Sequence, residues 1–394
     1  ARAFVRTMNS NASDGGGYDL VWSHLPEPVT AGMNRFFTVE FFREAQGILM
    51  PGGIFVTSCA GAAGYVGDEV GQYSGSIYRS LKSAFPEVRV TPGGNLFLAA
   101  ARREGTLNLD REVLGQRYEE RGISSEVFSP ILFQSLLDPR QVDFIEGEVR
   151  GYAVHASLNR DASPMTYLLN LRLWGAGTGS RIADRLLFVR YMKRVHIIFF
   201  MAAALAAAFF LARLMSRGGD NRSPGMIIAT TGFTGMSAQI IFLYSYQTKH
   251  GALYENLGMF VSCFMAGLFL SGGICTAILG RKKPAERQTR RALLGAESGL
   301  ILFFLLSAIL IRLGIQGQAV CYLMAVFAGG LIGMEFPLAA RMDPFLDKKT
   351  GGAASRLERA DHAGAALGAL ATGILLLPAL GISMTLVLLA IIKL

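Results

Sequence analysis

One short polar segment near the start of the chain combines residue types that could do chemistry. It reads His24-Leu25-Pro26-Glu27-Pro28, with a histidine and a carboxylate three positions apart. Histidine can accept a proton near neutral pH, and a carboxylate can hold a cation by charge-assisted hydrogen bonds. The alternatives are a loop histidine that packs on Pro26 and an ordinary solvated glutamate, and the residues alone leave both interpretations open.

The pattern around this segment predicts a strand, a loop, a helix and a second strand. Tyr18–Trp22 is a short apolar run typical of a buried parallel strand, and the two prolines end it. Residues 38–49 carry apolar side chains at helical spacing, and Pro51-Gly52-Gly53 ends that helix before a strand begins at Ile54. Because ligands in an open α/β sheet bind beyond the carboxyl ends of the strands, the polar loop is expected to face such a crevice.

Further elements are expected on both sides of this stretch. The patterns predict a helix over Arg2–Met8, a helix from about Gly67 to Phe85, and an antiparallel strand pair, Glu87–Val90 and Asn95–Ala101. They then predict helices over Asp110–Arg121, Ser129–Leu137 and onward from Pro139.

A loop at Asn159–Pro164 precedes the apolar stretch Met165–Trp174, which is too short to span a bilayer. We expect an interfacial helix there, with its start capped by an Asn or Asp side chain and Trp174 at headgroup depth.

Composition divides the chain into a soluble part and a membrane part. Of 394 residues, 51% are hydrophobic and only 17% are charged, against about 25% charged in a soluble domain. Crossing a hydrocarbon core takes roughly 20 apolar residues. The stretches that meet or approach this length are Val195–Met215, Met226–Tyr246, Leu257–Leu279, Leu293–Ile311, Val320–Leu338 and Ala363–Leu380, with a seventh beginning near Met384.

Small residues recur at four-residue spacing within these stretches, at Gly267/Ser271, Gly329/Gly333 and Gly364/Gly368. Such spacing lets helix backbones approach closely in lipid, so we expect these positions at helix–helix contacts.

The net charge of +9 comes largely from short loops between apolar stretches, which favours flanks of membrane helices over nucleic-acid binding. The basic loops at 281–291 and 341–359 are expected on the cytoplasmic side, which places residues 1–190 outside. The basic residues at 185–194 flank the first expected span and indicate the opposite orientation. The side of the soluble domain is therefore open, and the loop charges favour an external or periplasmic one.

A few polar residues interrupt the apolar stretches: Gln239, Glu297, Glu335 and Asp361. Ionisable groups inside a membrane are candidates for function, which makes Glu335 and Gln239 candidates for lining a transport path. Glu335 also precedes Phe336-Pro337, a kink whose freed backbone groups a side chain can satisfy. The four cysteines form no CxxC motif and the five histidines show no ligand spacing, so we expect no disulfide framework and no metal site.

Residues 18–59 resemble the second half of spermidine synthases, the polyamine aminopropyltransferases, in their order of Tyr-Asp strand, polar loop, aromatic helix, Pro-Gly-Gly and strand. The chain is similar above all to bacterial relatives of that family in which the synthase-like domain is fused to transmembrane helices. The further segments that carry this resemblance are Gly75–Tyr78, Thr91–Asn95, Leu158–Pro164, Trp174, Thr231–Met236, Gly333–Pro337 and Ala360–Gly368.

The resemblance implies a Rossmann-like, class I methyltransferase-type α/β partial domain over residues 1–104 and a helical linker over 105–194. It also implies an all-α, multi-pass transmembrane bundle of about seven helices over 195–394, with the last helix truncated.

The resemblance also implies a transferase that moves an aminopropyl group from decarboxylated S-adenosylmethionine to a diamine. The family's Asp-x-x-Asp-Pro loop supplies a base and a second carboxylate, and His24 and Glu27 stand at those positions. A substrate-contacting glutamine aligns with Ser58, and a tyrosine aligns with Thr91. With these positions changed, we expect a divergent diamine site and an activity other than spermidine synthesis.

Three functions therefore stay open: a membrane-anchored transferase, a catalytically degenerate structural or interaction subunit, and a transporter with a sensing domain. No Gly-rich donor-binding segment is visible before Tyr18, so we expect a fragment that binds no cofactor by itself. The expected location is the bacterial inner membrane. The expected partners are the lipid bilayer and other membrane subunits or a second copy, without nucleic acid.

Overall fold

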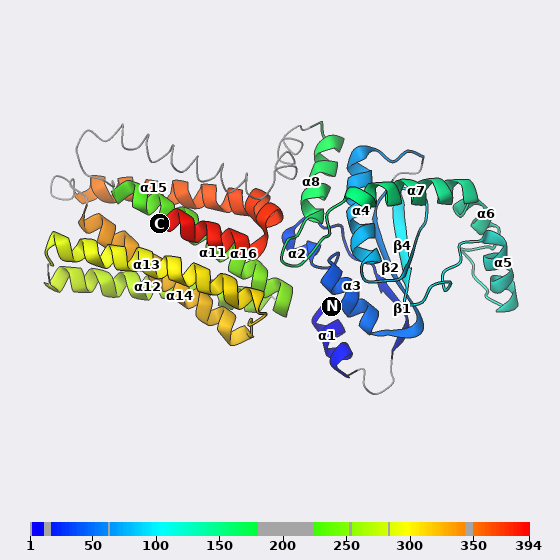
Figure 1. Ribbon diagram of the computed structural model, residues 1–394, viewed down its shortest axis with the longest axis horizontal. Helices are drawn as coiled ribbons and strands as arrows, with labels where there is room; N and C mark the ends of the chain where they lie inside the picture. The colour runs from blue at the N-terminus through cyan, green and yellow to red at the C-terminus, as the bar shows by residue number, and fades with distance from the viewer. Residues whose placement is uncertain are drawn as a thin grey trace. The chain divides into compact units, whose positions relative to one another are not determined.

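The computed structural model of the chain describes residues 2–11, 17–61, 64–179, 224–251, 254–282, 284–342 and 350–394. The chain divides into two compact units, Ala1–Leu187 and Phe188–Leu394. The first unit combines a small sheet with helices, and the second is helical in its described residues (Figure 1).

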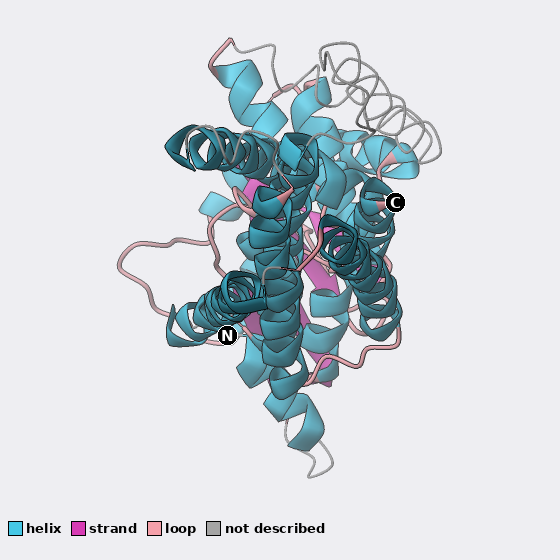
Figure 2. Ribbon diagram, turned by 90° about the vertical axis from the view of Figure 1, so that its left-hand side faces the viewer, coloured by secondary structure: helices cyan, strands magenta, loops and turns pink. Residues whose placement is uncertain are grey.

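A mixed four-stranded sheet forms the centre of the first unit (Figure 2). Its strands are β1 (Tyr18–Ser23), β2 (Leu49–Ala60), β3 (Glu87–Val90) and β4 (Asn95–Ala101), in the spatial order β1-β2-β4-β3. β1 and β2 are parallel, and β4 is antiparallel to both β2 and β3. The predicted bounds of the last two strands and their antiparallel pairing are confirmed.

Eight described helices accompany the sheet, and their ends follow local sequence signals. They are α1 (Arg2–Asn11), α2 (Ala31–Asn34), α3 (Val39–Gly47), α4 (Asp68–Lys82), α5 (Arg111–Glu120), α6 (Leu132–Leu136), α7 (Pro139–His155) and α8 (Thr166–Gly177). The side chains of Thr38, Asp110 and Asp138 accept backbone hydrogen bonds at the starts of α3, α5 and α7. These are the residue types that cap helices.

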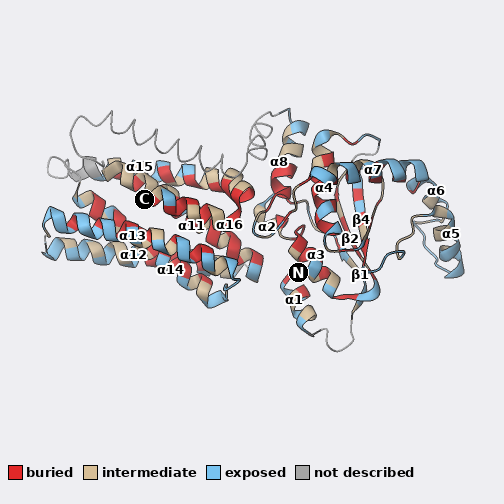
Figure 3. Ribbon diagram, viewed as in Figure 1, coloured by how far each residue is buried: buried red, intermediate tan, exposed pale blue. Residues whose placement is uncertain are grey.

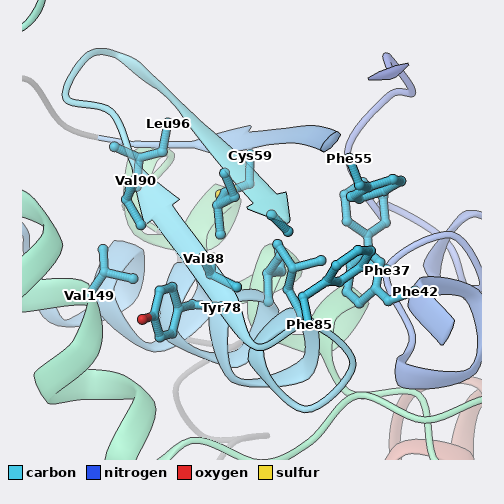
Figure 4. Packing of buried hydrophobic residues seen from close by; sticks show 14 of the residues in the cluster. Phe37, Phe42, Phe55, Cys59, Tyr78, Phe85, Val88, Val90, Leu96 and Val149 are labelled. Atoms are coloured by element: carbon cyan, nitrogen blue, oxygen red, sulfur yellow. The ribbon is translucent and has the colours of Figure 1, made fainter. Parts of the chain in front are cut away.

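The core of the first unit lies on one face of the sheet, where Phe42, Phe55 and Phe85 pack with aliphatic side chains (Figure 4). Alternation along β1 sends Leu20 and Trp22 to the other face, where they are 56% and 60% exposed. The prediction of a fully buried β1 is therefore wrong. The strand is parallel, as expected, but only one of its faces contributes to the core.

The Pro51-Gly52-Gly53 turn lies inside β2 instead of before it, so the predicted start of this strand at Ile54 is wrong. Tyr18 pairs with Leu49 but Leu20 pairs with Ile54, so the extra residues of β2 form an irregularity in the register. Proline has no backbone donor and is tolerated in strands mainly at edges and bulges, which explains its place here.

The region expected to be a linker packs into the core of the first unit. Val149 of α7 and Leu169 of α8 belong to the same buried cluster as the sheet residues. Two glycines of α4, Gly71 and Gly75, allow this contact, because a Cβ at either would meet Tyr152 of α7.

The first half of α8 is buried, so the prediction of an interfacial helix is wrong for residues 166–170, although Trp174 is exposed. The predicted cap holds only in part: Met165 occupies the N-cap position and its side chain forms no cap, but Asn159 Oδ1 accepts from the backbone N of Met165 at 2.8 Å.

The second unit consists of long helices in its described residues. They are α11 (Pro224–His250), α12 (Tyr254–Lys282), α13 (Glu286–Arg312), α14 (Gln318–Arg341), α15 (Thr350–Ala371), the π-helical η2 (Thr372–Leu376) and α16 (Leu377–Lys393). Five helical stretches among the described residues are long and apolar enough to cross a membrane, which supports a multi-pass membrane protein. The expected span Val195–Met215 lies outside the described residues.

The last of these stretches, Ala354–Lys393, reverses its direction at Gly381, whose φ of 76° favours glycine. Gly364 packs against Ala229, and Lys393 hydrogen-bonds Thr231, so both arms meet α11 near its start. The reversal falls between the expected sixth span and the seventh that was expected near Met384.

Glycines bring the helices of the second unit into backbone contact. A Cβ at Gly364 or Gly368 would collide with carbonyl oxygens of α11, and one at Gly329 or Gly333 with carbonyl oxygens of α12. The predicted close packing at these positions is confirmed. The outward faces of α12 and α13 are exposed (Figure 3). They carry apolar side chains such as Phe269 and Leu302, as suits helices in contact with lipid.

The start of α11, the end of α12, the start of α13 and the end of α14 meet at one end of the second unit, where the last three carry basic residues. Thr231 of α11 lies against Glu335 of α14, and Gly272 of α12 lies against Gly333, so the start of α11 and the ends of α12 and α14 are neighbours. α13 begins four residues after α12 ends. We call this the basic end, and its cationic residues on α12, α13 and α14 are Arg281, Lys282, Arg287, Arg290, Arg291 and Arg341.

Candidate functional site

The polar segment His24–Pro28 follows β1 directly, so it lies at the carboxyl ends of the parallel strands β1 and β2. Glu27 is half-buried there, and its Oε2 accepts a hydrogen bond from Asn170 Nδ2 of α8 at 2.8 Å. Asn170 is 1% exposed. A carboxylate held by a buried amide at strand ends is a position where ligands bind in α/β sheets.

Four buried polar atoms in this region make no hydrogen bond of standard geometry among the described residues: Ser23 Oγ, Thr57 Oγ1, Tyr73 OH and Asn170 Oδ1. The Tyr73 hydroxyl lies close enough to the Asn170 side chain for a weaker contact with it. Ser23 and Thr57 are register partners on β1 and β2, so their side chains share one face of the sheet. Cys59 follows on that face, and both Cys59 and Glu27 lie close enough to Tyr73 to raise the pKa of its phenol. We call Glu27, Asn170, Tyr73, Ser23 and Thr57 the Glu27 cluster.

Unpartnered buried polar atoms are costly, and native proteins rarely keep them without a ligand or a bound water. A primary ammonium group has three donors and no acceptor. The Glu27 cluster offers a carboxylate, an amide oxygen and hydroxyl oxygens that can all accept. Its donor–acceptor balance therefore suits a protonated primary amine.

Burial keeps the other titratable groups of this region in their neutral forms. Desolvation raises the pKa of the Tyr73 phenol well above its usual value, and Cys59 and Glu27 act in the same direction. Burial likewise raises the pKa of the Cys59 thiol, so this cysteine is a poor nucleophile at neutral pH. Glu27 supplies the one carboxyl group of the Glu27 cluster.

The other predicted site residues of the first unit lie on the open face of the sheet. The His24 ring packs edge-on against Trp22, with 5.6 Å between centroids, so its packing does not depend on Pro26 alone. Ser58 pairs with Phe97, and the backbone N of Phe97 donates to Thr91 Oγ1 at 3.2 Å. Ser58 and Thr91 are thus both neighbours of Phe97. The Glu27 side chain, by contrast, lies on the covered face of the sheet.

A buried network of ionisable groups lies inside the second unit. Lys393 Nζ of α16 lies 2.6 Å from Glu335 Oε2 of α14 and 3.2 Å from Glu297 Oε1 of α13. It also donates to Thr231 Oγ1 of α11 at 2.9 Å, and Thr231 in turn donates to Glu335. Four helices are therefore joined by one ammonium and two carboxylates.

The other polar positions predicted for the second unit take no part in this network among the described contacts. Gln239 is half-buried and lies two turns further along α11 than Thr231. Asp361 of α15 approaches Gly232 through its backbone. Among the described residues, no group of three or more His, Cys, Asp and Glu side chains could hold a metal ion.

Sequence reasoning missed Asn170, Tyr73 and Lys393. Asn170 is the one uncharged amide in the apolar stretch Met165–Trp174, and Lys393 interrupts an apolar run that has Glu297 and Glu335 as possible partners elsewhere. Both signals were present in the sequence. Tyr73 carries no signal, because its position in the site follows from the packing of α4 on the sheet.

The chain matches no protein-family model, and a search of curated proteins finds no significant match. The resemblance to spermidine synthases accordingly stays a hypothesis drawn from the motifs.

Proposed function

We propose that the first unit binds a protonated primary amine at the Glu27 cluster, as the acceptor side of an aminopropyltransferase-like site, and that the helical unit fixes it to a bilayer. The observation that carries this proposal is the set of unpartnered buried oxygens beside the Glu27 carboxylate among the described residues. The motif resemblance supports the same class of substrate, a diamine. The acceptor position differs from that of the family, since the His24 side chain faces away from the cluster.

In this proposal Glu27 both holds the amine and accepts its proton. Once Glu27 has taken one proton from the ammonium, the nitrogen lone pair attacks the propyl carbon next to the sulfonium of the donor. The carbon–sulfur bond breaks, and its electron pair neutralises the sulfur, which leaves as a thioether. Positioned proton transfer of this kind contributes roughly 10²–10⁴-fold to a rate.

Titration of 1,4-diaminobutane into the purified full chain tests the amine site. A hydrogen bond to a charged group contributes about 1.5–3 kcal/mol, so Glu27→Gln should weaken binding at least about tenfold. Glu126→Gln replaces an exposed glutamate of the same unit and should leave the affinity unchanged, as should His24→Ala. If the Glu27 and Glu126 variants bind the diamine with equal affinity, the Glu27 cluster is not the amine-binding site. If the unmodified chain binds no diamine, the degenerate structural subunit is favoured.

The buried network around Lys393 favours a second candidate function, transport of a cation through the bundle. Carboxylates in membrane helices commonly mark substrate or ion pathways. Uptake of radiolabelled diamine by proteoliposomes, lost in Glu335→Gln and kept in Glu126→Gln, would support it. If uptake equals that of empty liposomes, the network has no role in transport and only stabilises the bundle.

We further propose that the chain resides in the bacterial inner membrane with its basic end toward the cytoplasm. The clustering of cationic residues at that end supports this orientation, since positive charge is retained inside.

A further inference from the structure

An apolar groove of about 610 Å³ runs along the outside of the second unit between α12 and α14. Its lining begins at Leu268 and Phe269, passes the contact between Gly272 and Gly333, and reaches Gly280 and Arg341 at the basic end. Its lining is apolar apart from Thr276 and Arg341. The Thr276 hydroxyl donates to the Gly272 carbonyl within its own helix at 2.8 Å.

The groove exists because side chains are absent along its floor. A Cβ added at Gly280 would meet no atom within 4 Å, so the space in front of this residue is open. On the facing helix, Pro337 has no backbone N–H to offer and Phe336 points partly outward. The space therefore faces the surroundings of the bundle and not its interior.

The length of the groove matches one leaflet of a bilayer. The eleven residues from Phe269 to Gly280 advance about 17 Å along a helix. Half of a hydrocarbon core is about 15 Å thick. An acyl chain that enters from the basic end could therefore lie along the whole groove.

The charge at the end of the groove specifies the headgroup. Arg341 is exposed and forms no ion pair with any residue that the structure describes. A guanidinium binds phosphate oxygens through paired, charge-assisted hydrogen bonds. Arg281 and Lys282 end α12 beside it and add further positive charge.

We propose that the groove between α12 and α14 binds one anionic phospholipid, with an acyl chain along Phe269 to Gly280 and the phosphate on Arg341. The proposal rests on the placement of the helical unit in a bilayer. Charge complementarity favours a lipid over a second copy of the chain, because a second copy would bring the same cationic end to this position.

Native mass spectrometry of the detergent-purified full chain tests this site with dioleoyl-phosphatidylglycerol and dioleoyl-phosphatidylcholine as probes. We expect one phosphatidylglycerol to bind at least tenfold more tightly than phosphatidylcholine. Gly280→Leu fills the groove and should reduce phosphatidylglycerol binding at least tenfold. Gly273→Leu, on the same helix with equally open space but outside the groove, should change it less than twofold.

Arg341→Gln should remove the preference for the anionic lipid, whereas Arg312→Gln, at the opposite end of α13 from the basic residues, should retain it. Thermal unfolding of each variant shows that it is folded. Equal binding of both lipids with no effect of Gly280→Leu would overturn the site, and a dimer that Gly280→Leu dissociates would assign the groove to a second copy. Recovery of the chain without detergent would instead refute the membrane placement itself.

Discussion

Tyr73 carries a buried hydroxyl that costs stability if the Glu27 cluster is built for a ligand. Its OH makes no hydrogen bond of standard geometry among the described residues, and its one nearby polar side chain is Asn170, so Tyr73→Phe gives up at most that weak contact. We expect the free energy of unfolding to stay equal or to rise by up to about 1 kcal/mol, while amine affinity falls. Denaturant unfolding and amine titration of the same variant measure both effects.

The matched control is Tyr78→Phe on the same helix. The Tyr78 hydroxyl accepts a hydrogen bond from Arg150 Nε at 3.1 Å, so its loss should destabilise the fold by about 1 kcal/mol. Amine affinity should not change. A Tyr73→Phe variant that loses stability as Tyr78→Phe does would contradict the assignment of its hydroxyl to ligand binding.

Glu40 makes stability depend on pH in a direction opposite to most carboxylates. Burial raises the pKa of the Glu40 carboxyl, and the neighbouring Asp161 acts in the same direction. The folded state therefore favours the protonated form, so the penalty from Glu40 is present above its raised pKa and disappears as pH falls below its unfolded value of about 4.3.

Glu40→Gln keeps an acceptor for the backbone N of Asp161, which bonds Glu40 Oε2 at 3.0 Å. The variant should be more stable at pH 7, by less than about 1 kcal/mol because the group is partly solvated. The gain should vanish near pH 4. Denaturation midpoints at both pH values provide the check, and a loss of stability at pH 7 would show that the ion pair with Arg160 dominates.

Lys393 neutralises buried charge in the second unit. Removing one partner of a buried ion pair typically costs about 3–5 kcal/mol, because the other charge is left uncompensated. The Lys393→Met variant should lose about this much free energy of unfolding. A triple variant that adds Glu335→Gln and Glu297→Gln should regain much of that stability. Unfolding in detergent gives the measurement. Lys282→Met, at the exposed end of α12, is the control, and equal stability of the two lysine variants would exclude the network from stabilising the bundle.

At the scale of elements, the contact of α12 with α14 depends on single glycines. A Cβ at Gly329 would collide with the Phe264 carbonyl, whereas one at the adjacent Gly330 would meet nothing within 4 Å. Gly329→Leu should therefore lower the unfolding temperature by several degrees or prevent folding, and Gly330→Leu should have little effect. Thermal unfolding in detergent compares them, and similar behaviour of both would contradict the close approach of the two backbones as a requirement for packing.

Element positions could largely be predicted, because local signals determine them. Asp110 and Thr38 mark helix starts, Gly364 and Gly368 mark a packed face, and the Pro92-Gly93-Gly94 turn marks the strand pair that ends in β4. The burial of α8 and the open face of β1 could not be predicted. Both depend on which elements meet in space, and Met165–Trp174 has the same apolar pattern whether it lies on a membrane or on α4.

At the scale of the whole molecule, the basic end predicts the direction in which the helices cross the bilayer. In intact cells, Arg287→Cys at the basic end should be protected from a membrane-impermeant maleimide, and Leu313→Cys at the opposite end of α13 should be labelled. The reverse pattern would invert the proposed orientation. Glu104→Cys reports the side of the first unit separately, and labelling is expected there if that unit is external.

The candidate site illustrates where sequence reasoning ends. The polar loop, its place at the strand ends and the charge of Glu27 followed from residue types and from the strand pattern. The separation of His24 from Glu27 did not, because three residues of loop are enough to turn two side chains to opposite faces of a sheet. The partners Asn170 and Tyr73 come from helices more than 40 residues away in the chain.

The most direct measurement of the central claim is an experimental structure of the full chain with 1,4-diaminobutane at saturating concentration. The account predicts an ammonium nitrogen within hydrogen-bond distance of a Glu27 carboxylate oxygen and Asn170 Oδ1, with His24 not in contact. A diamine bound between His24 and Ser58 on the open face, or an empty Glu27 cluster at saturation, would contradict it.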